Sequence, residues 1–185
     1  MPADRLIPPP PPPSARSPRA VEVVAAAAQI VEAEGTDALT MRRLAEDLGI
    51  RAPSLYKHFP DKAALEVALV EDALLDMGAA LHEALARPGR RQPVASLLAA
   101  YRRQGVQHPN LYRLATAGPL ARAHLAPGVE DWAGAPFYLA TGDPHRAQAL
   151  FAFAHGMVIL EIDERFPPAS ELDRTWRAGA AAFAR

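Results

Sequence analysis

The chain has 185 residues, half of them hydrophobic, and its 20 basic and 21 acidic residues leave a formal net charge of −1. This length suits one hydrophobic core of ordinary size, or a small module joined to a larger helical domain. The chain contains no cysteine, which excludes disulfides and thiolate chemistry and fits a reducing cytoplasm. No apolar stretch reaches the ~18 residues of a membrane span, and no signal-peptide core stands at the N-terminus. We therefore expect a cytoplasmic protein with no membrane partner.

Residues 1–17 form a proline-rich tail with six consecutive prolines, Pro8 to Pro13. Such a run cannot form a helix and predicts extended polyproline II or disorder. Arg5, Arg16 and Arg19 leave two interpretations of this tail. It is either a basic arm that reaches a nucleic-acid backbone or a solvated tail of no consequence, and we favour the second.

A helix is predicted from Pro18 to Glu34, where Gly35 stops it. Alanine is abundant, and the alternation typical of strands is hard to find anywhere in the chain, so we expect an all-α fold.

Residues 40–62 predict two short helices joined by a glycine turn. Thr40 is a suitable N-cap, and Gly49 follows the last apolar residue of the first helix, where a left-handed residue favours glycine. Pro53 is tolerated only in the first turn of a helix, so the second helix starts near residue 51 or 52 and ends near Phe59. Apolar residues fall where the two helices must pack on each other: Leu44, Ala45, Leu48, Ile50, Leu55 and Phe59.

The polar side chains of this segment are left facing outward, and the segment carries five Lys or Arg against three acids. A helix-turn-helix places its second helix in the major groove of DNA, so the pattern predicts a DNA-binding protein whose partner is a double-stranded operator. The candidate DNA-binding residues are Thr40, Arg42, Arg51, Ala52, Pro53, Ser54, Tyr56, Lys57, His58 and Lys62.

The run Leu55-Tyr56-Lys57-His58-Phe59, followed by Asp61, Lys62 and Leu65, resembles the recognition-helix signature of the TetR family of bacterial transcriptional regulators. The first helix fits as well, through Val23, Val24, Ala27, Ile30, Val31 and Gly35, so that the resemblance covers residues 20–67. The family usually carries a small hydroxyl residue at the entry to the recognition helix, where this chain has Arg51 and Ala52. Either Ser54, from within the helix, or a charged contact from Arg51 then takes that role.

The second part of the chain predicts further helices. They span 62–86, ended by Pro88 and Gly89, then 93–107, a short helix after His108-Pro109, one near 132–138, and one from about 143 to 165. Asp143 is a predicted N-cap, and Ser170 with Asp173 resembles a capping box for the last helix. We expect an N-terminal three-helix DNA-binding domain at 18–65 and a helical regulatory domain, for effector binding and dimerisation, at 66–185.

Two C-terminal pieces, His108-Pro109-Asn110-Leu111-Tyr112 and Phe153-Ala154-His155-Gly156, partly resemble a TetR subgroup with a Trp-His-Gly motif, Ala154 replacing the tryptophan. The resemblance implies a repressor that binds a palindromic operator as a homodimer and is released by a small effector. We expect that effector to be largely apolar, because few charged residues fall among the aromatic residues of this part of the chain. Residues at helical spacing predict a two-helix dimer face: Ala149, Ala152, Phe153, Gly156, Ile159, Leu160, Leu172, Trp176, Ala180 and Phe183.

Candidate lining residues for an effector pocket are Tyr101, Tyr112, Trp132, Phe137, Phe151 and His155, although aromatic residues at such spacing are more often plain core. His155 has no carboxylate or histidine at i+3 or i+4, so we expect no metal site. With no phosphate loop, nucleophile elbow or carboxylate pair in the sequence, we expect neither an enzyme nor a cofactor. The alternative function is a helical DNA-associated or protein-interaction factor without small-molecule sensing.

Overall fold

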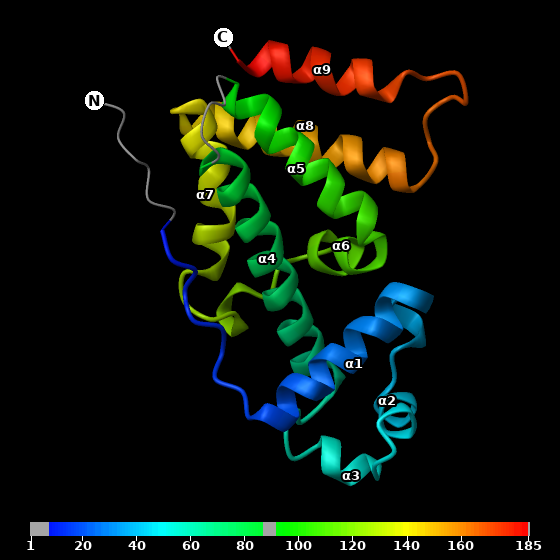
Figure 1. Ribbon diagram of the computed structural model, residues 1–185. Helices are drawn as coiled ribbons and strands as arrows, with labels where there is room; N and C mark the ends of the chain where they lie inside the picture. The colour runs from blue at the N-terminus through cyan, green and yellow to red at the C-terminus, as the bar shows by residue number, and fades with distance from the viewer. Residues whose placement is uncertain (1–7, 87–91, 185) are drawn as a thin grey trace. The chain divides into compact units, whose positions relative to one another are not determined.

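A computed structural model describes residues 8–86 and 92–184, and every regular element in these ranges is a helix (Figure 1). The expected all-α fold is confirmed. No helix within these ranges is long and apolar enough to span a membrane. The predicted helix-breaking residues Pro88 and Gly89 lie outside the described residues, as does Arg5. The elements are α1 (Pro18–Glu34), η1 (Thr36–Ala38), α2 (Met41–Asp47), α3 (Ala52–Leu55), α4 (Lys62–Ala86), α5 (Pro93–Gln107), α6 (Pro109–Thr116), η2 (Arg122–His124), α7 (Val129–Thr141), α8 (Pro144–Ile162) and α9 (Leu172–Phe183).

The chain divides into two compact units. The N-terminal unit comprises residues 11–74 and 108–130, and the C-terminal unit comprises the described parts of 1–10, 75–107 and 131–185. Residues 108–130 therefore group with the helix-turn-helix rather than with the regulatory domain in which we expected them. Their first helix is tied to α1 by Glu32, whose carboxylate accepts from the backbone N–H groups of Asn110 and Leu111 at 3.4 and 3.2 Å. These bonds satisfy otherwise unpaired donors at the start of α6.

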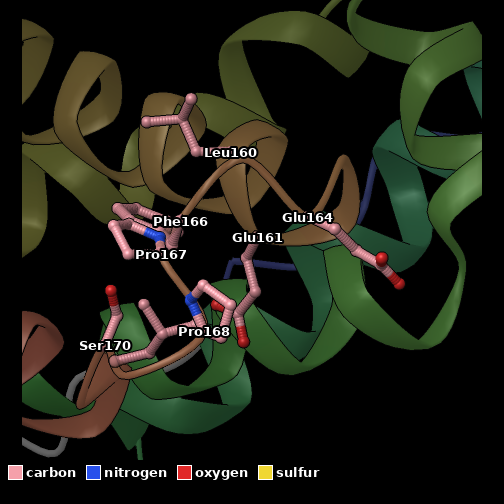
Figure 2. A pocket seen from close by; sticks show the side chains of 8 residues that line it. Leu160, Glu161, Glu164, Phe166, Pro167, Pro168 and Ser170 are labelled. Carbon is pink, nitrogen blue, oxygen red and sulfur yellow. The ribbon is translucent and has the colours of Figure 1, made fainter.

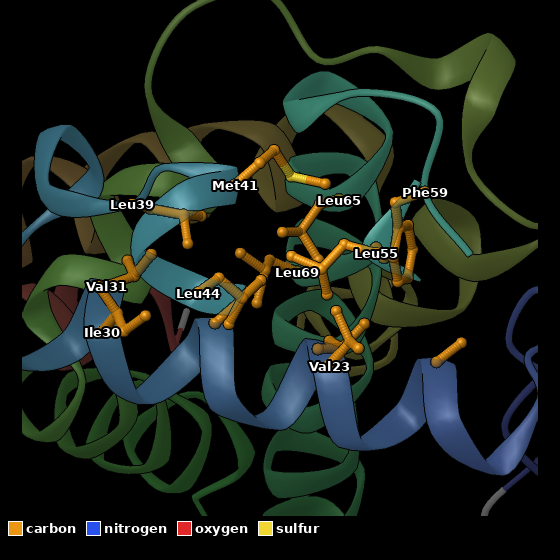
Figure 3. Close-up of a cluster of buried hydrophobic side chains, with 14 of the residues drawn as sticks. Val23, Ile30, Val31, Leu39, Met41, Leu44, Leu55, Phe59, Leu65 and Leu69 are labelled. Atoms are coloured by element: carbon orange, nitrogen blue, oxygen red, sulfur yellow. The ribbon is translucent and has the colours of Figure 1, made fainter. Parts of the chain in front are cut away.

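One apolar cluster holds the N-terminal unit together (Figure 3). Leu44 and Leu55, predicted to pack α2 on α3, are fully buried, and Phe59 is 7% exposed. They meet Val23 and Val31 of α1 and Leu65 of α4 within the same cluster. Burying a side chain of this size contributes about 1.5–3 kcal/mol, so these contacts fix how α2 and α3 pack on the rest of the unit.

The favoured interpretation of the proline-rich tail, a solvated tail of no consequence, is wrong, because Pro8, Ser14 and Arg16 form hydrogen bonds with distant residues. Ser14 and Arg16 hydrogen-bond to carboxylates of α4, and Pro8 accepts from the Nε1–H of Trp132 at 2.9 Å. Ser17 is the N-cap of α1. The sequence could not indicate these contacts, since the partners of the tail lie more than 50 residues away along the chain.

In the C-terminal unit, Arg102 of α5 joins α8 and α9. Its guanidinium donates to Glu161 at 2.8–3.0 Å and to Asp173 at 2.5 Å, and it lies 5.7 Å from the ring centroid of Trp176. The hydrogen bond from Arg102 holds the pKa of Asp173 below its ordinary value. This bond also explains why the predicted Ser170 capping box is wrong. The Asp173 carboxylate is directed to Arg102, and Glu171 stands at the N-cap without a side-chain cap.

The start of α8 agrees with the sequence prediction, but its end does not. Asp143 caps α8 as predicted, accepting from the backbone N–H of Arg146 at 2.8 Å. The helix ends at Ile162 rather than near 165, because Glu164 adopts a left-handed conformation with φ 51°. The backbone N–H of Arg165 then donates back to the carbonyl of Leu160 at 2.9 Å, which closes the end of the helix.

His82 is a buried histidine on α4, within the C-terminal unit. It is 3% exposed, its Nε2–H donates to the carbonyl of Trp132 at 3.0 Å, and the two ring centroids lie 4.7 Å apart. Burial lowers the pKa of His82 below its ordinary value of 6.5. The ring therefore stays neutral in the folded protein at a pH where the unfolded chain is already protonated.

We expect the free energy of unfolding to fall as the pH is lowered below about 6.5, because unfolded His82 binds a proton that the folded ring excludes. One such proton gives a slope of at most about 1.4 kcal/mol per pH unit, and the loss continues until the pH reaches the folded pKa. Denaturant titrations across this range check the prediction. His82→Gln, which keeps a donor for the Trp132 carbonyl, should flatten the slope in part, since burial also lowers the pKa of His155. An equal slope in both proteins contradicts it.

Candidate nucleic-acid interface

The helix-turn-helix is built by local signals that the sequence shows directly. The Oγ1 of Thr40 accepts from the backbone N–H of Arg43 at 3.1 Å and caps α2. Gly49 has φ 64°, the left-handed conformation that its place in the turn requires. The backbone N–H of Ile50 donates to the carbonyl of Ala45 at 2.9 Å and closes the end of α2. The predicted turn is confirmed.

The second helix is shorter than predicted. α3 ends at Leu55, not near Phe59, and the chain continues as a turn through His58. The backbone N–H groups of His58 and Phe59 both donate to the carbonyl of Leu55, at 2.9 and 3.0 Å, so three-residue and four-residue bonds compete there. Pro60, which has no N–H, follows immediately. We call residues 51–58 the reading segment.

The N-terminus of α3 has no side-chain cap. Arg51 occupies the N-cap position, and its carbonyl accepts from the backbone N–H of Ser54 at 2.8 Å. Neither of the two predicted substitutes, Ser54 or Arg51, caps the helix with its side chain. With the N–H of Ser54 already bonded and none at Pro53, this helix end offers few backbone donors to a phosphate.

The side chains of the reading segment divide into a buried anchor and an exposed face. Leu55 is fully buried, whereas Tyr56 is 50% exposed, an unusual exposure for a large aromatic residue. Arg51, Pro53 and Lys57 are exposed, and Ala52, Ser54 and His58 are partly buried. Seven of the predicted residues thus lie on one segment that a buried leucine fixes to the core.

Other predicted cations are already paired with the protein. Arg42 is exposed but donates to Glu46 at 2.9 Å, one turn along α2. Lys62 donates to the carbonyl of Thr36 at 3.2 Å and lies 3.3 Å from Glu66. Lys62 therefore links the start of α4 to η1, a structural role that the sequence did not indicate. Exposed pairs of this kind are worth little, so exchange for a phosphate costs little.

Sequence reasoning missed Ser17. Its Oγ accepts from the backbone N–H of Ala20 at 3.2 Å, capping α1, and lies 3.3 Å from Nδ1 of His58. The N-terminus of α1 thus contacts the end of the reading segment. Ser17 followed by Pro18 is a typical helix start, a local signal that could have indicated the cap but not the contact with His58.

The family model described as "Bacterial regulatory proteins, tetR family" matches residues 23–69, which contain α1, the helix-turn-helix and the start of α4. This part of the chain belongs to the TetR family. This is a family of DNA-binding transcriptional regulators, which agrees with the expectation that the chain is not an enzyme.

Individual relatives match different lengths of the chain. The class A tetracycline repressor protein from transposon 1721 of Escherichia coli is 46% identical over 54 residues, which are 29% of this chain and 25% of that protein. A protein with unknown function from Rhodococcus sp. RHA1 has a TM-score of 0.74 at 25% identity, covering 95% of this chain and 98% of the other. TetR from Acinetobacter baumannii AYE shares the fold, with a TM-score of 0.61 at 20% identity over 89% of this chain and 94% of the other. The chain therefore spans about a quarter of the curated TetR repressor but nearly the whole of both solved folds.

The predicted effector residues fall into two groups. Tyr101, Phe137 and Phe151 meet edge to face in the C-terminal unit, with ring centroids 5.5–6.3 Å apart, and His155 stacks on Phe151 at 6.0 Å. Trp132 belongs to the same unit and pairs with His82, whereas Tyr112 lies in the N-terminal unit. The structure therefore does not bring Tyr112 together with the others within one unit.

A shallow pocket of about 220 Å³ lies between the end of α8 and the start of α9 (Figure 2). None of the predicted effector residues lines it, and its walls are Leu160, Glu161, Glu164, Phe166, Pro167, Pro168, Ser170 and Leu172. Leu160 and Leu172 were predicted for the dimer face instead.

The predicted dimer residues also divide. Phe153 packs inside the subunit, with its ring centroid 5.8 Å from those of Trp176 and Phe183, and Ala180 is buried. Ala149, Ala152 and Leu160 of α8 are exposed, and the remaining members, Gly156, Ile159 and Leu172, are partly buried. We call Ala149, Ala152 and Leu160 the exposed α8 stripe.

Proposed function

We propose that this TetR-family chain is a ligand-responsive transcriptional repressor. It binds a palindromic operator as a homodimer and is released by a small, largely apolar effector. The observation that carries the DNA-binding part is the reading segment. Its buried Leu55 anchors a face on which Arg51, Tyr56 and Lys57 are exposed together. The name of the related tetracycline repressor supports repression over activation.

The exposed α8 stripe supports the homodimer. Its small and apolar side chains occur at helical spacing on a helix whose other face is packed on α5 and α9. Pairing of α8 and α9 across a two-fold axis would form a four-helix interface. Two reading segments would then face successive major grooves, about 34–36 Å apart or farther, on a palindromic site.

The aromatic cluster of Tyr101, Phe137, Phe151 and His155 supports an apolar effector, because these rings contact one another and offer largely apolar surface. α4 contributes residues to both units, so a ligand that shifts this helix changes the position of the reading segment. A coupling free energy of about 1–3 kcal/mol would weaken operator binding by about 5–150-fold.

Operator selection from random duplexes, followed by a thermal-shift screen of small molecules, tests this function. We expect a palindromic consensus, and we expect a stabilising compound to lower operator affinity, since the ligand favours the state that binds DNA poorly. Failure to select any duplex contradicts DNA binding. Unchanged operator affinity with every stabilising compound supports the alternative, a helical DNA-associated factor that senses no small molecule.

A further inference from the structure

A carboxylate lies fully buried on α4 within the N-terminal unit. Glu71 is 0% exposed and accepts four hydrogen bonds, from the backbone N–H of Ser14 at 2.6 Å, Ser14 Oγ at 2.8 Å, Arg16 Nη2 at 3.0 Å and the backbone N–H of Ala126 at 2.9 Å. It therefore joins three segments that are far apart in the sequence. These are the arm before α1 (residues 11–17), α4 and the loop that follows η2.

The charge of Glu71 is kept despite its burial. Burial alone raises the pKa of this carboxyl, but the hydrogen bonds from Ala126 and Ser14 and the charge of Arg16 together hold it below its ordinary value. Arg16 is itself only 10% exposed, donates to both oxygens of Asp72 at 2.7 Å and reaches the carbonyl of Ala68 at 3.2 Å. The arm is thus held by charge-assisted hydrogen bonds. Loss of one partner leaves a buried charge unpaired and strongly destabilises this arrangement.

The arm enters α1 directly after Arg16. Ser17, the next residue, caps the first turn of α1, and its Oγ lies 3.3 Å from Nδ1 of His58 at the end of the reading segment. The bonds to Glu71 therefore fix the chain immediately before the residue that contacts the reading segment. Without them, ordering this region would add to the free-energy cost of binding DNA.

We propose that Glu71 is a positioning residue for operator binding: by holding Ser14 and Arg16, it fixes Ser17 against His58. This inference rests on the proposed function. Glu71 touches no DNA in this arrangement, since its carboxylate is fully enclosed by α4, the arm and the loop. Arg16 is likewise committed to α4 and is not a free basic group of the arm.

Two variants test the role of Glu71. Glu71→Gln keeps the shape but leaves one acceptor oxygen, and it turns an NH₂ group toward donors such as the N–H of Ala126. Ser14→Pro removes both Ser14 donors at a position that directly follows six consecutive prolines, and it leaves Glu71 unchanged. Glu130→Gln is the matched control, because Glu130 pairs with Arg122 at the surface of the same unit.

Two measurements are compared across these proteins. The first is the rate at which trypsin cleaves after Arg16, read by mass spectrometry, which reports whether the arm is bound. The second is affinity for the selected operator. For both Glu71→Gln and Ser14→Pro we expect cleavage to become at least about tenfold faster and operator binding to weaken about tenfold, while Glu130→Gln matches the wild type.

The outcomes separate the inference from the proposed function. Faster cleavage with unchanged or tighter operator binding overturns the positioning role, and unchanged cleavage in either folded variant overturns the arm contact itself. Should Glu71→Gln fail to fold by circular dichroism, Ser14→Pro alone decides. If the wild type selects no operator, the proposed function falls together with this inference. If the wild type binds and the variants bind equally well, the inference alone falls.

Discussion

Lys57→Ala should weaken binding to the selected operator by about 1–3 kcal/mol and relax the preference at the base pair that Lys57 contacts. Lys57 is exposed in the turn that follows α3, and nearby Leu55 is fully buried. Because buried Leu55 holds this segment to the core, we expect Lys57→Ala to leave the fold intact. Fluorescence anisotropy on the consensus and on single-base variants measures both effects.

Two controls distinguish a base contact from a loss of charge. Arg174→Ala removes one positive charge from an exposed pair with Glu171 on α9, outside the N-terminal unit, and should leave operator preference unchanged. Tyr56→Ala should weaken all sequences about equally, because a hydroxyl bonded to phosphate carries no sequence information. Retained operator binding in alanine variants of Tyr56, Lys57 and Lys62 contradicts the assignment of these residues to the DNA interface.

Lys62→Ala should affect both DNA binding and the stability of the fold. As a phosphate contact, Lys62 would weaken binding to every sequence and lower the salt slope by about one unit when removed. Its bond to the Thr36 carbonyl also links η1 to α4, so a fall in melting temperature should accompany the change. Measuring the salt slope at a temperature well below the melting transition separates the two effects. An unchanged slope assigns Lys62 to the structural role alone.

The sequence predicted those features whose signals are local. Thr40 and Asp143 cap helices three residues away, and Gly35 and Gly49 have φ values of 86° and 64°, so a short window of sequence contains the whole cause. The apolar spacing of α2 and α3 likewise predicted the buried Leu44 and Leu55, because helical periodicity alone decides which face is buried.

What the sequence did not predict depends on partners far along the chain. The contacts of the proline-rich tail require Glu71, which lies 57 residues from Ser14 in the sequence. The missing side-chain cap of α9 follows from the bond of Asp173 to Arg102, 71 residues away. Tyr112 was grouped with the other aromatic residues by composition, yet α6 belongs to the N-terminal unit through Glu32. In each case a charged side chain binds a partner that is distant in the sequence, and no local sequence pattern specifies such a partner.

Ala152→Glu should convert the protein to a monomer and reduce operator affinity by at least about 100-fold, because one subunit then binds only one half-site at a time. Ala152 is exposed in the middle of the exposed α8 stripe, so a glutamate there is tolerated by the isolated subunit. In a dimer the same carboxylate would be buried without a partner, which costs several kcal/mol. Analytical ultracentrifugation and anisotropy on the palindrome measure the two effects.

Ala99→Glu is the matched control for this dimer prediction, since Ala99 is an exposed alanine of α5 outside the predicted interface. It adds the same charge to the same unit, so any general electrostatic repulsion from DNA appears in both variants. We expect it to sediment as a dimer and to bind the operator with nearly wild-type affinity. A dimer that persists in Ala152→Glu would show that the exposed α8 stripe lies outside the interface. Equal losses of affinity in both variants would trace the effect to charge rather than to assembly.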